Sequence, residues 1–198
     1  WMVEERLPKG DENPMKNYTL DILAELTQNG QRIDTNEIAH FVEQIKQANH
    51  IFLNGAGRSG IAIRAFANRL MHIGFSVSIV GEISSPHSKP GDLLIICSGS
   101  GETGSLKSLA EKAKQSGIDL ALVTMKKEST IGQLADVVLV LPGTTKEEND
   151  RETASFAQPM GSAFEQLAFL TFDGMVLNLM DELGETSETM FKRHADFE

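Results

Sequence analysis

The 198 residues of the chain are enough for one domain with a sizeable hydrophobic core. Its 28 acidic residues outnumber its 18 basic ones, and the formal net charge of −10 argues against nucleic acid or an anionic membrane surface as a partner. The single cysteine, Cys97, excludes a disulfide framework and a cysteine-based metal cluster.

The N-terminal stretch differs from the rest of the chain. Residues 1–14 are mostly polar, contain two prolines and show no hydrophobic periodicity, and the sequence from Met15 looks like a natural beginning. We therefore expect residues 1–14 to be a non-native remnant or a disordered leader, and residues 15–198 to form a single domain. Since we find neither a signal sequence nor an apolar run as long as a membrane span, we expect a cytoplasmic protein.

Hydrophobic periodicity predicts helices and strands that alternate along most of the chain. The predicted helices span residues 18–28, 33–48, 61–73, 105–115 and 160–183, with shorter helical segments near 130–134 and within 185–198. The predicted strands span residues 51–53, 76–80, 93–97, 120–124 and 137–141. Because every predicted strand is a continuous apolar run, we expect an α/β fold: a doubly wound, five-stranded parallel sheet of order 2-1-3-4-5, flanked by helices.

The loop after the first predicted strand has two interpretations. The spacing Gly55-x-Gly57-x-x-Gly60, with Glu82 about twenty residues further on, fits a dinucleotide-binding fingerprint. Alternatively, Arg58 and Ser59 close over a sugar phosphate that a second loop holds. We favour the sugar phosphate because a nicotinamide site does not require the hydroxyl-rich loop described next.

The loop after the third predicted strand alternates hydroxyl side chains with glycines. Its members are Ser98, Gly99, Ser100, Gly101, Glu102 and Thr103. A helix follows, and a helix start offers about four unpaired backbone N–H groups to an anion. No lysine follows the glycines, so this is not the nucleotide loop Gly-x-x-x-x-Gly-Lys-Ser/Thr. We predict a cradle for a phosphate monoester; the alternative is that the hydroxyls only cap the helix.

The two loops are expected to share one crevice, because they leave neighbouring strands at the same edge of the sheet. The longest predicted helix, 160–183, is apolar over more than one stripe, which indicates burial on two sides, as in a subunit interface. Glu165 is the lone charge in its first half. The five histidines show no spacing typical of zinc, so we predict no metal.

Several of these motifs together resemble a known family. Asn-Gly-Ala-Gly-Arg-Ser-Gly at 54–60 and Ser-Gly-Ser-Gly-Glu-Thr at 98–103 resemble the sugar isomerase (SIS) domain family. Met-Gly-Ser-x-Phe-Glu at 160–165 and Lys-Arg-His at 192–194 are similar to the 6-phospho-3-hexuloisomerases within that family. The resemblance runs from about Tyr18 to the C-terminus.

The resemblance implies an isomerase that interconverts D-arabino-3-hexulose 6-phosphate and D-fructose 6-phosphate through an enediol. It further implies a homotetramer or dimer without metal or organic cofactor, and a functional link to 3-hexulose-6-phosphate synthase in the ribulose monophosphate pathway of formaldehyde assimilation. The implied phosphate ligands are Ser59, Ser98, Gly99, Ser100, Gly101 and Thr103. The implied catalytic residues are Glu165 as the base and His194, from its own or a neighbouring subunit. Gly57, Arg58 and Glu102 are given supporting places.

Two other functions stay open at this point. The residues themselves do not determine the sugar, so another aldose–ketose isomerase, for example one acting on arabinose 5-phosphate, is an alternative. A non-catalytic module that binds a sugar phosphate on the same fold is the other.

Overall fold

The computed structural model describes residues 15–143 and 158–196, so the expectation for residues 1–14 lies outside the described residues. The helices are α1 (Thr19–Gly30), α2 (Thr35–Gln47), α3 (Gly57–Ile73), α4 (Gly104–Gln115), α5 (Thr130–Leu134), α6 (Ser162–Leu183) and α7 (Ser187–Phe191), with a 3-10 turn η1 (Pro159–Gly161). The strands are β1 (Ile51–Gly55), β2 (Val77–Ile79), β3 (Leu93–Cys97), β4 (Asp119–Thr124) and β5 (Val137–Val140).

The strands form a parallel sheet of order β2-β1-β3-β4-β5, which confirms the predicted fold class and strand order. In the register of β1 and β3, Ile51 lies opposite Leu93 and Gly55 lies opposite Cys97. The two strands therefore end together, and the loops that follow them start side by side.

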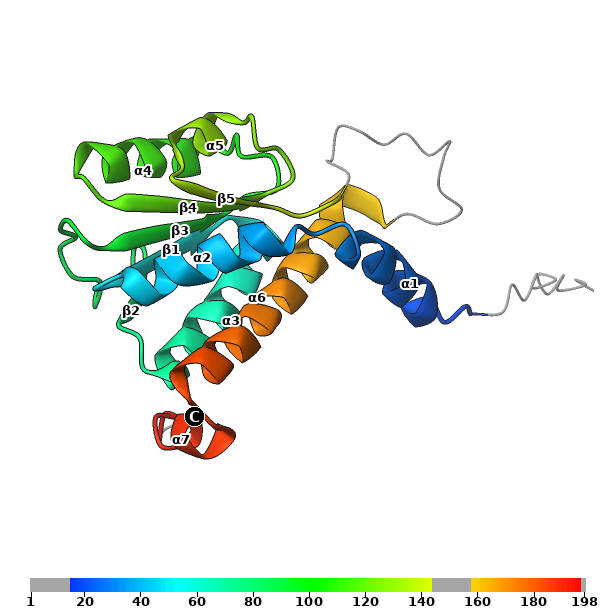
Figure 1. The fold of residues 1–198 in the computed structure, drawn as a ribbon. Coiled ribbons are helices and arrows are strands. Elements are labelled where there is room, and N and C mark those ends of the chain that lie inside the picture. The colour runs from blue at the N-terminus through cyan, green and yellow to red at the C-terminus, as the bar shows by residue number, and fades with distance from the viewer. Residues whose placement is uncertain (1–14, 144–157, 197–198) are drawn as a thin grey trace, which may run out of the picture.

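Helices cover both faces of the sheet (Figure 1), with α2, α3 and α6 on one face and α4 and α5 on the other. Strand β3 is buried throughout, and its side chains alternate between the two cores. Ile95 packs in the core under α3 and α6, whereas Ile96 packs in the core under α4. On the larger core, the rings of Phe66 and Phe172 stack with centroids 4.5 Å apart and join α3 to α6.

Helix α3 begins four residues earlier than the periodicity predicts, because the glycines of the predicted loop 54–60 form the end of β1 and the first turn of the helix. The backbone of Gly60 lies against β1, and a Cβ at this position would come within 2.6 Å of the carbonyl oxygen of Gly55. Glycine therefore allows this close approach, although its low helix propensity made the segment look like a loop.

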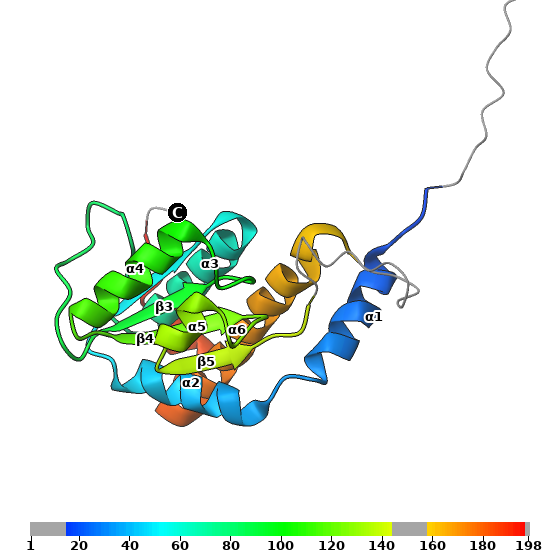
Figure 2. The same ribbon diagram turned by 90° about the horizontal axis from the view of Figure 1, so that it is seen from above.

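Helix α6 begins at Ser162, after a turn in which Met160 has the left-handed φ of 58°. Part of the surface of α6 is buried against α3, but the helix also exposes Phe169, Leu170 and Leu177, so it is apolar over more than one stripe, as predicted. Helix α1 projects from the body of the molecule beside the first turns of α6 (Figure 2). Across the two described ranges, no helix is both long and apolar enough to span a bilayer.

Candidate active site

A pocket of about 570 Å³ lies where β1 and β3 end, at the carboxyl edge of the sheet. It is lined by the start of α3, the loop after β3, the loop after β4 and the start of α6. The predicted site residues in its lining are Gly57, Arg58, Ser59, Ser98, Gly99, Ser100, Glu102, Thr103 and Glu165. The structure thus brings both glycine-containing segments and the acid of α6 to one crevice.

The loop after β3 is a compact turn of hydroxyls and backbone donors. Ser98 Oγ lies 3.5 Å from Thr103 Oγ1 and accepts a hydrogen bond from the Gly101 N–H at 3.2 Å. Thr103 is the N-cap residue of α4, but within the described residues its side chain makes no cap hydrogen bond. This argues against the alternative that the hydroxyls only cap the helix, and leaves Thr103 Oγ1 at the pocket wall beside the first turn of α4.

Both glycines of this loop lie in close packing, and the requirement for glycine is stronger at Gly101. Gly101 has a φ of 64°, and a Cβ there would come within 2.0 Å of Ser129 Oγ. A Cβ on Gly99 would come within 2.8 Å of the Met125 side chain. Gly101 is buried behind the loop, where its carbonyl accepts from the Ile131 N–H at 3.2 Å, so it shapes the cradle from outside the pocket wall.

Glu165 stands in the first turn of α6 and pairs with the guanidinium of Arg58, whose Nε donates to its Oε2. The Glu165 side chain is only 14% exposed, whereas Arg58 is 59% exposed and covers it from the solvent side. Since α3 supplies the arginine and α6 the acid, the ion pair depends on the packing of these two helices at the pocket.

Cys97 ends β3 at the floor of the same pocket. Burial raises the pKa of its thiol to about 12, although a hydrogen bond with Ser59 opposes the shift. The thiol is therefore protonated at neutral pH, so Cys97 is a poor candidate for a proton acceptor, and Glu165 stays the predicted one.

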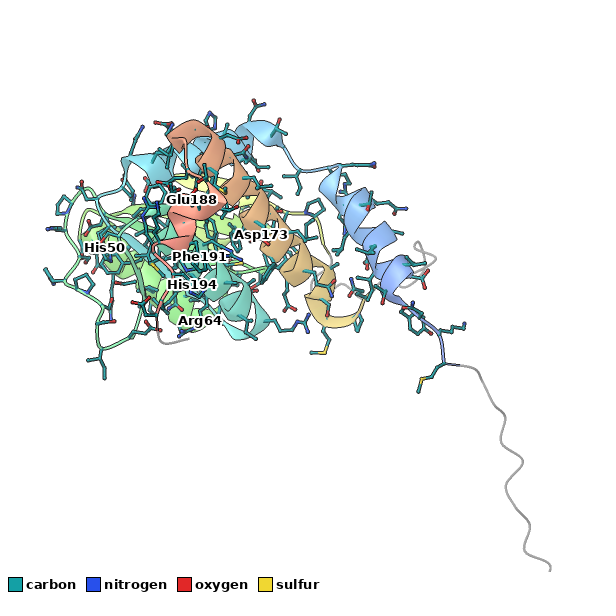
Figure 3. All side chains as sticks on the ribbon, turned by 90° about the horizontal axis from the view of Figure 1, so that it is seen from below. His50, Arg64, Asp173, Glu188, Phe191 and His194 are labelled. Atoms are coloured by element: carbon teal, nitrogen blue, oxygen red, sulfur yellow. The ribbon has the colours of Figure 1, made fainter. Side chains whose placement is uncertain are left out.

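His194 lies elsewhere in the chain. It lines a second pocket of about 410 Å³ at the far ends of α3 and α6, where its ring stacks on that of His72 with centroids 5.1 Å apart. Figure 3 shows His194 and Phe191 of the C-terminal segment beside Asp173 of α6. One chain therefore does not bring His194 to Glu165, and its catalytic role stays a prediction that needs a neighbouring subunit.

The dinucleotide interpretation gains no support from the position of Glu82. This carboxylate pairs with Arg64 of α3 at 2.8 Å. Among residues 15–143 and 158–196, no three His, Cys, Asp or Glu side chains gather into a possible metal site.

The pocket wall also contains Met125, Lys126, Met160 and Phe164, which the sequence analysis did not assign to the site. Lys126 follows β4, and its N–H donates to Thr124 Oγ1 at 3.2 Å. The sequence could have indicated Lys126, because it comes directly after the strand next to β3 and ligands bind beyond the carboxyl ends of parallel strands.

Comparison with known proteins gives a consistent result. The family model described as SIS domain matches residues 44–171. The chain is 44% identical to a 3-hexulose-6-phosphate isomerase of Bacillus subtilis, over 91% of this chain and 97% of that protein. It is 34% identical to the enzyme of the same name from Mycobacterium gastri, over 88% and 86% of the two chains.

A solved structure agrees with these relatives. The crystal structure of a Methanococcus jannaschii protein, for which the function of a 3-hexulose-6-phosphate isomerase was inferred, superposes with a TM-score of 0.76 at 30% identity. The match covers 90% of this chain and 96% of that one. The name denotes the activity of the 6-phospho-3-hexuloisomerases. The chain belongs to the SIS domain family, among the relatives of 3-hexulose-6-phosphate isomerase.

Proposed function

We propose that the protein is an isomerase that interconverts D-arabino-3-hexulose 6-phosphate and D-fructose 6-phosphate. The observation that carries this proposal is a pocket in which a hydroxyl-rich cradle faces the carboxylate of Glu165, whereas the other carboxylate of the lining, that of Glu102, is hydrogen-bonded to Thr130. The relatives named for this activity match nearly the whole chain, which supports the choice of sugar over arabinose 5-phosphate.

The cradle binds the phosphate of the sugar. Ser98, Ser100 and Thr103 offer hydroxyl groups, Ser59 adds one from α3, and the first turn of α4 adds backbone N–H groups. Because the whole chain carries a net charge of −10, the long-range field opposes an anion, and these local donors must supply the affinity.

The chemistry needs one proton acceptor next to C2 and C3. A C3 ketone whose C6 oxygen carries phosphate has no hydroxyl left to close a five-membered ring, so the substrate enters as an open chain. Glu165 removes the proton from C2, the electron pair forms an enediolate across C2 and C3, and the same carboxyl returns a proton to C3. The hydroxyl proton on O2 moves to O3, and the carbonyl is then at C2.

Arg58 stabilises the charged species along this path. Its guanidinium lies against Glu165 before the reaction and remains beside the enediolate after the carboxylate has taken the proton. No step of this scheme uses a metal or an organic cofactor, and we expect full activity in the presence of EDTA.

We further propose a homo-oligomer, a tetramer or dimer, in which a neighbour supplies His194. The described surface exposes large apolar side chains on α1, α3 and α6 and at the N-cap of α1, namely Tyr18, Leu20, Leu23, Ile61, Phe169, Leu170 and Leu177. We call the surface of α3 and α6 that carries Ile61, Phe169, Leu170 and Leu177 the α3–α6 face. These helices run from the first pocket to the second, about 25 Å along the 17 residues of α3. A two-fold axis near its middle would set the His194 pocket of each copy beside the Glu165 pocket of the other.

In this proposal the protein acts in the cytoplasm, in the ribulose monophosphate pathway of formaldehyde assimilation, and takes its substrate from 3-hexulose-6-phosphate synthase. The test is a coupled assay in which purified protein converts 3-hexulose 6-phosphate and the fructose 6-phosphate formed is measured. Arabinose 5-phosphate serves as the competing substrate. Turnover of arabinose 5-phosphate alone, or binding of fructose 6-phosphate with no turnover of either sugar, would contradict the proposal.

A further inference from the structure

Glu102 places a negative charge two residues from Ser100, in a loop proposed to bind a phosphate dianion. A carboxylate there would repel the ligand unless its charge is engaged elsewhere. The structure shows such an engagement: Oε1 accepts from the Thr130 N–H at 2.6 Å, and Oε2 accepts from Thr130 Oγ1 at 2.8 Å. Lys107 Nζ adds a third donor at 3.3 Å.

Thr130 belongs to a segment that holds the cradle from behind. The next residue, Ile131, donates its N–H to the carbonyl of Gly101, and the preceding residue, Ser129, fills the space that a Cβ on Gly101 would need. Thr130 itself is not among the described residues that line the pocket. The contacts between Glu102 and Thr130 therefore join the cradle to α5 from outside the ligand space.

The other end of the cradle is fastened to the same connection. The carbonyl of Gly99 accepts from the Met125 N–H at 3.0 Å and from Thr124 Oγ1 at 3.1 Å. The segment from the end of β4 to the start of α5 thus holds the cradle at Gly99 and again at Gly101 and Glu102. Glu102 contributes its side chain to the second of these attachments, through Thr130. A loop held in this way needs no ordering when the phosphate binds.

We infer that Glu102 is a positioning residue, which holds the phosphate cradle in shape through Thr130 and so sets the affinity for a phosphorylated sugar. The inference rests on the proposed function, both for the phosphate in the cradle and for the identity of the sugar. The hydrogen bonds from Thr130 lower the pKa of Glu102, so the side chain is ionised at neutral pH and accepts from both donors.

Three variants test this role: Glu102→Ala, Glu102→Gln and Thr130→Val. We expect Glu102→Ala to raise KM for 3-hexulose 6-phosphate about ten-fold, because bonds to a charged acceptor are lost. Thr130→Val should raise KM about three-fold although it lies outside the pocket. Glu102→Gln should fall between wild type and Glu102→Ala, since the amide oxygen still accepts from the Thr130 N–H. In all three, kcat should stay within about two-fold, because Glu165 is untouched.

Two results would overturn the inference. A lower KM in both Glu102→Ala and Glu102→Gln would mean that the carboxylate mainly repels the phosphate. A large loss of kcat in Glu102→Ala with normal kinetics in Thr130→Val would mean that Glu102 acts on the sugar directly. The Tm of each variant shows whether the whole fold is destabilised or only the affinity of the cradle is changed. If Glu102→Ala does not fold, the KM of Thr130→Val still tests the inference.

Direct measurement of ligand affinity makes the test independent of turnover. Titration calorimetry with fructose 6-phosphate and with inorganic phosphate should show the same order of affinities: wild type, Glu102→Gln, Glu102→Ala. If wild type does not turn over 3-hexulose 6-phosphate, the proposed function fails, whereas equal phosphate affinities in all the proteins would reject the positioning role alone. Glu111→Gln, on the exposed face of α4, is the matched control and should change neither KM nor affinity.

Discussion

At the scale of single residues, Glu165 carries the proposed proton transfer. We expect Glu165→Gln to lower kcat by about 10²–10⁴-fold, because the amide cannot accept a proton, while the affinity for fructose 6-phosphate stays largely intact. Steady-state kinetics and titration calorimetry on one preparation measure the two quantities. Glu188→Gln, an exposed residue of α7, is the control. Near-normal turnover in Glu165→Gln would remove Glu165 from its role.

The sequence predicted most of the residues that line the pocket, but not the side chains with which they pair. The place of Ser98, Ser100 and Thr103 in the pocket lining could be predicted, because their loop follows a buried strand and ligands bind beyond the carboxyl ends of parallel strands. The partner of Glu102 could not, because Thr130 is 28 residues away and only the packing of α5 against the loop brings the two together. Arg58 was placed near the ligand, but its pairing with Glu165 depends on how α3 meets α6.

At the scale of elements, the close approach of α3 to β1 determines where the pocket opens. Gly60→Ala would put a Cβ within 2.6 Å of the Gly55 carbonyl oxygen, and neither backbone can move without shifting the helix or the strand. We expect a loss of about 1–3 kcal/mol in the free energy of unfolding, measured by urea denaturation. Gly104→Ala, in open space at the start of α4, should be neutral or slightly stabilising. Equal stabilities for the two variants would contradict this reading of Gly60.

Helix α7 is fastened to α3 by a charged clamp. Both terminal nitrogens of Arg193 donate hydrogen bonds to the carboxylate of Glu185, each at 2.9 Å. One of them, Nη1, also donates to the carbonyl of His72 at 2.9 Å. Hydrogen bonds from Arg193 and then Thr189 lower the pKa of Glu185 to about 2 from 4.5. The carboxylate form is therefore favoured in the folded state, so the clamp stabilises fully above about pH 4.5 and weakens as the pH falls toward 2.

Because of this clamp, we expect the difference in thermal stability between wild type and Glu185→Gln to depend on pH. We expect a lower Tm for the variant at pH 7, and a difference that shrinks as the pH falls below about 4.5, in thermal scans at low salt. Glu188→Gln removes only an exposed pair with Lys192 and should show little difference at any pH. A difference that is constant down to pH 3 would contradict the role of Glu185.

Helix starts were the elements that periodicity placed least well. The predicted start of α3 at residue 61 is wrong because four residues rich in glycine begin the helix. The predicted start of the last long helix at residue 160 is wrong because Met160 adopts a left-handed conformation, which is uncommon for methionine and could not be predicted from the residue type. The strands were predicted to within two residues at each end, since buried parallel strands are continuous apolar runs.

At the scale of the whole molecule, the fold followed from the alternation of strands and helices, but the position of His194 did not. The sequence does not indicate where the C-terminal segment packs, and the structure places it against the ends of α3 and α6 that lie far from the first pocket. With the C-terminal segment in its observed position, a catalytic His194 requires an assembly. The exposed apolar residues of the α3–α6 face are the surface on which that assembly is expected.

Leu177→Asp tests the assembly at that surface. Leu177 is 62% exposed on α6 and lines the pocket of His194, so a carboxylate there would be buried without a partner in a packed interface. We expect a smaller particle in light scattering after size exclusion, and a large loss of kcat with an unchanged Tm at low concentration. Ile83→Asp, on an exposed loop, should leave the assembly intact. An assembled, active Leu177→Asp protein would contradict the proposed interface.

Mixing two inactive variants decides whether His194 acts across that interface. If each site combines Glu165 of one copy with His194 of another, then in a hybrid of Glu165→Gln and His194→Ala chains some sites contain both native residues. Activity should therefore return when the two proteins are unfolded and refolded together, and not when each is refolded alone. If both residues act within one chain, no hybrid contains an intact site and the mixture stays inactive. The second outcome would require the C-terminal segment to leave its clamp on α3 and reach the first pocket of its own chain.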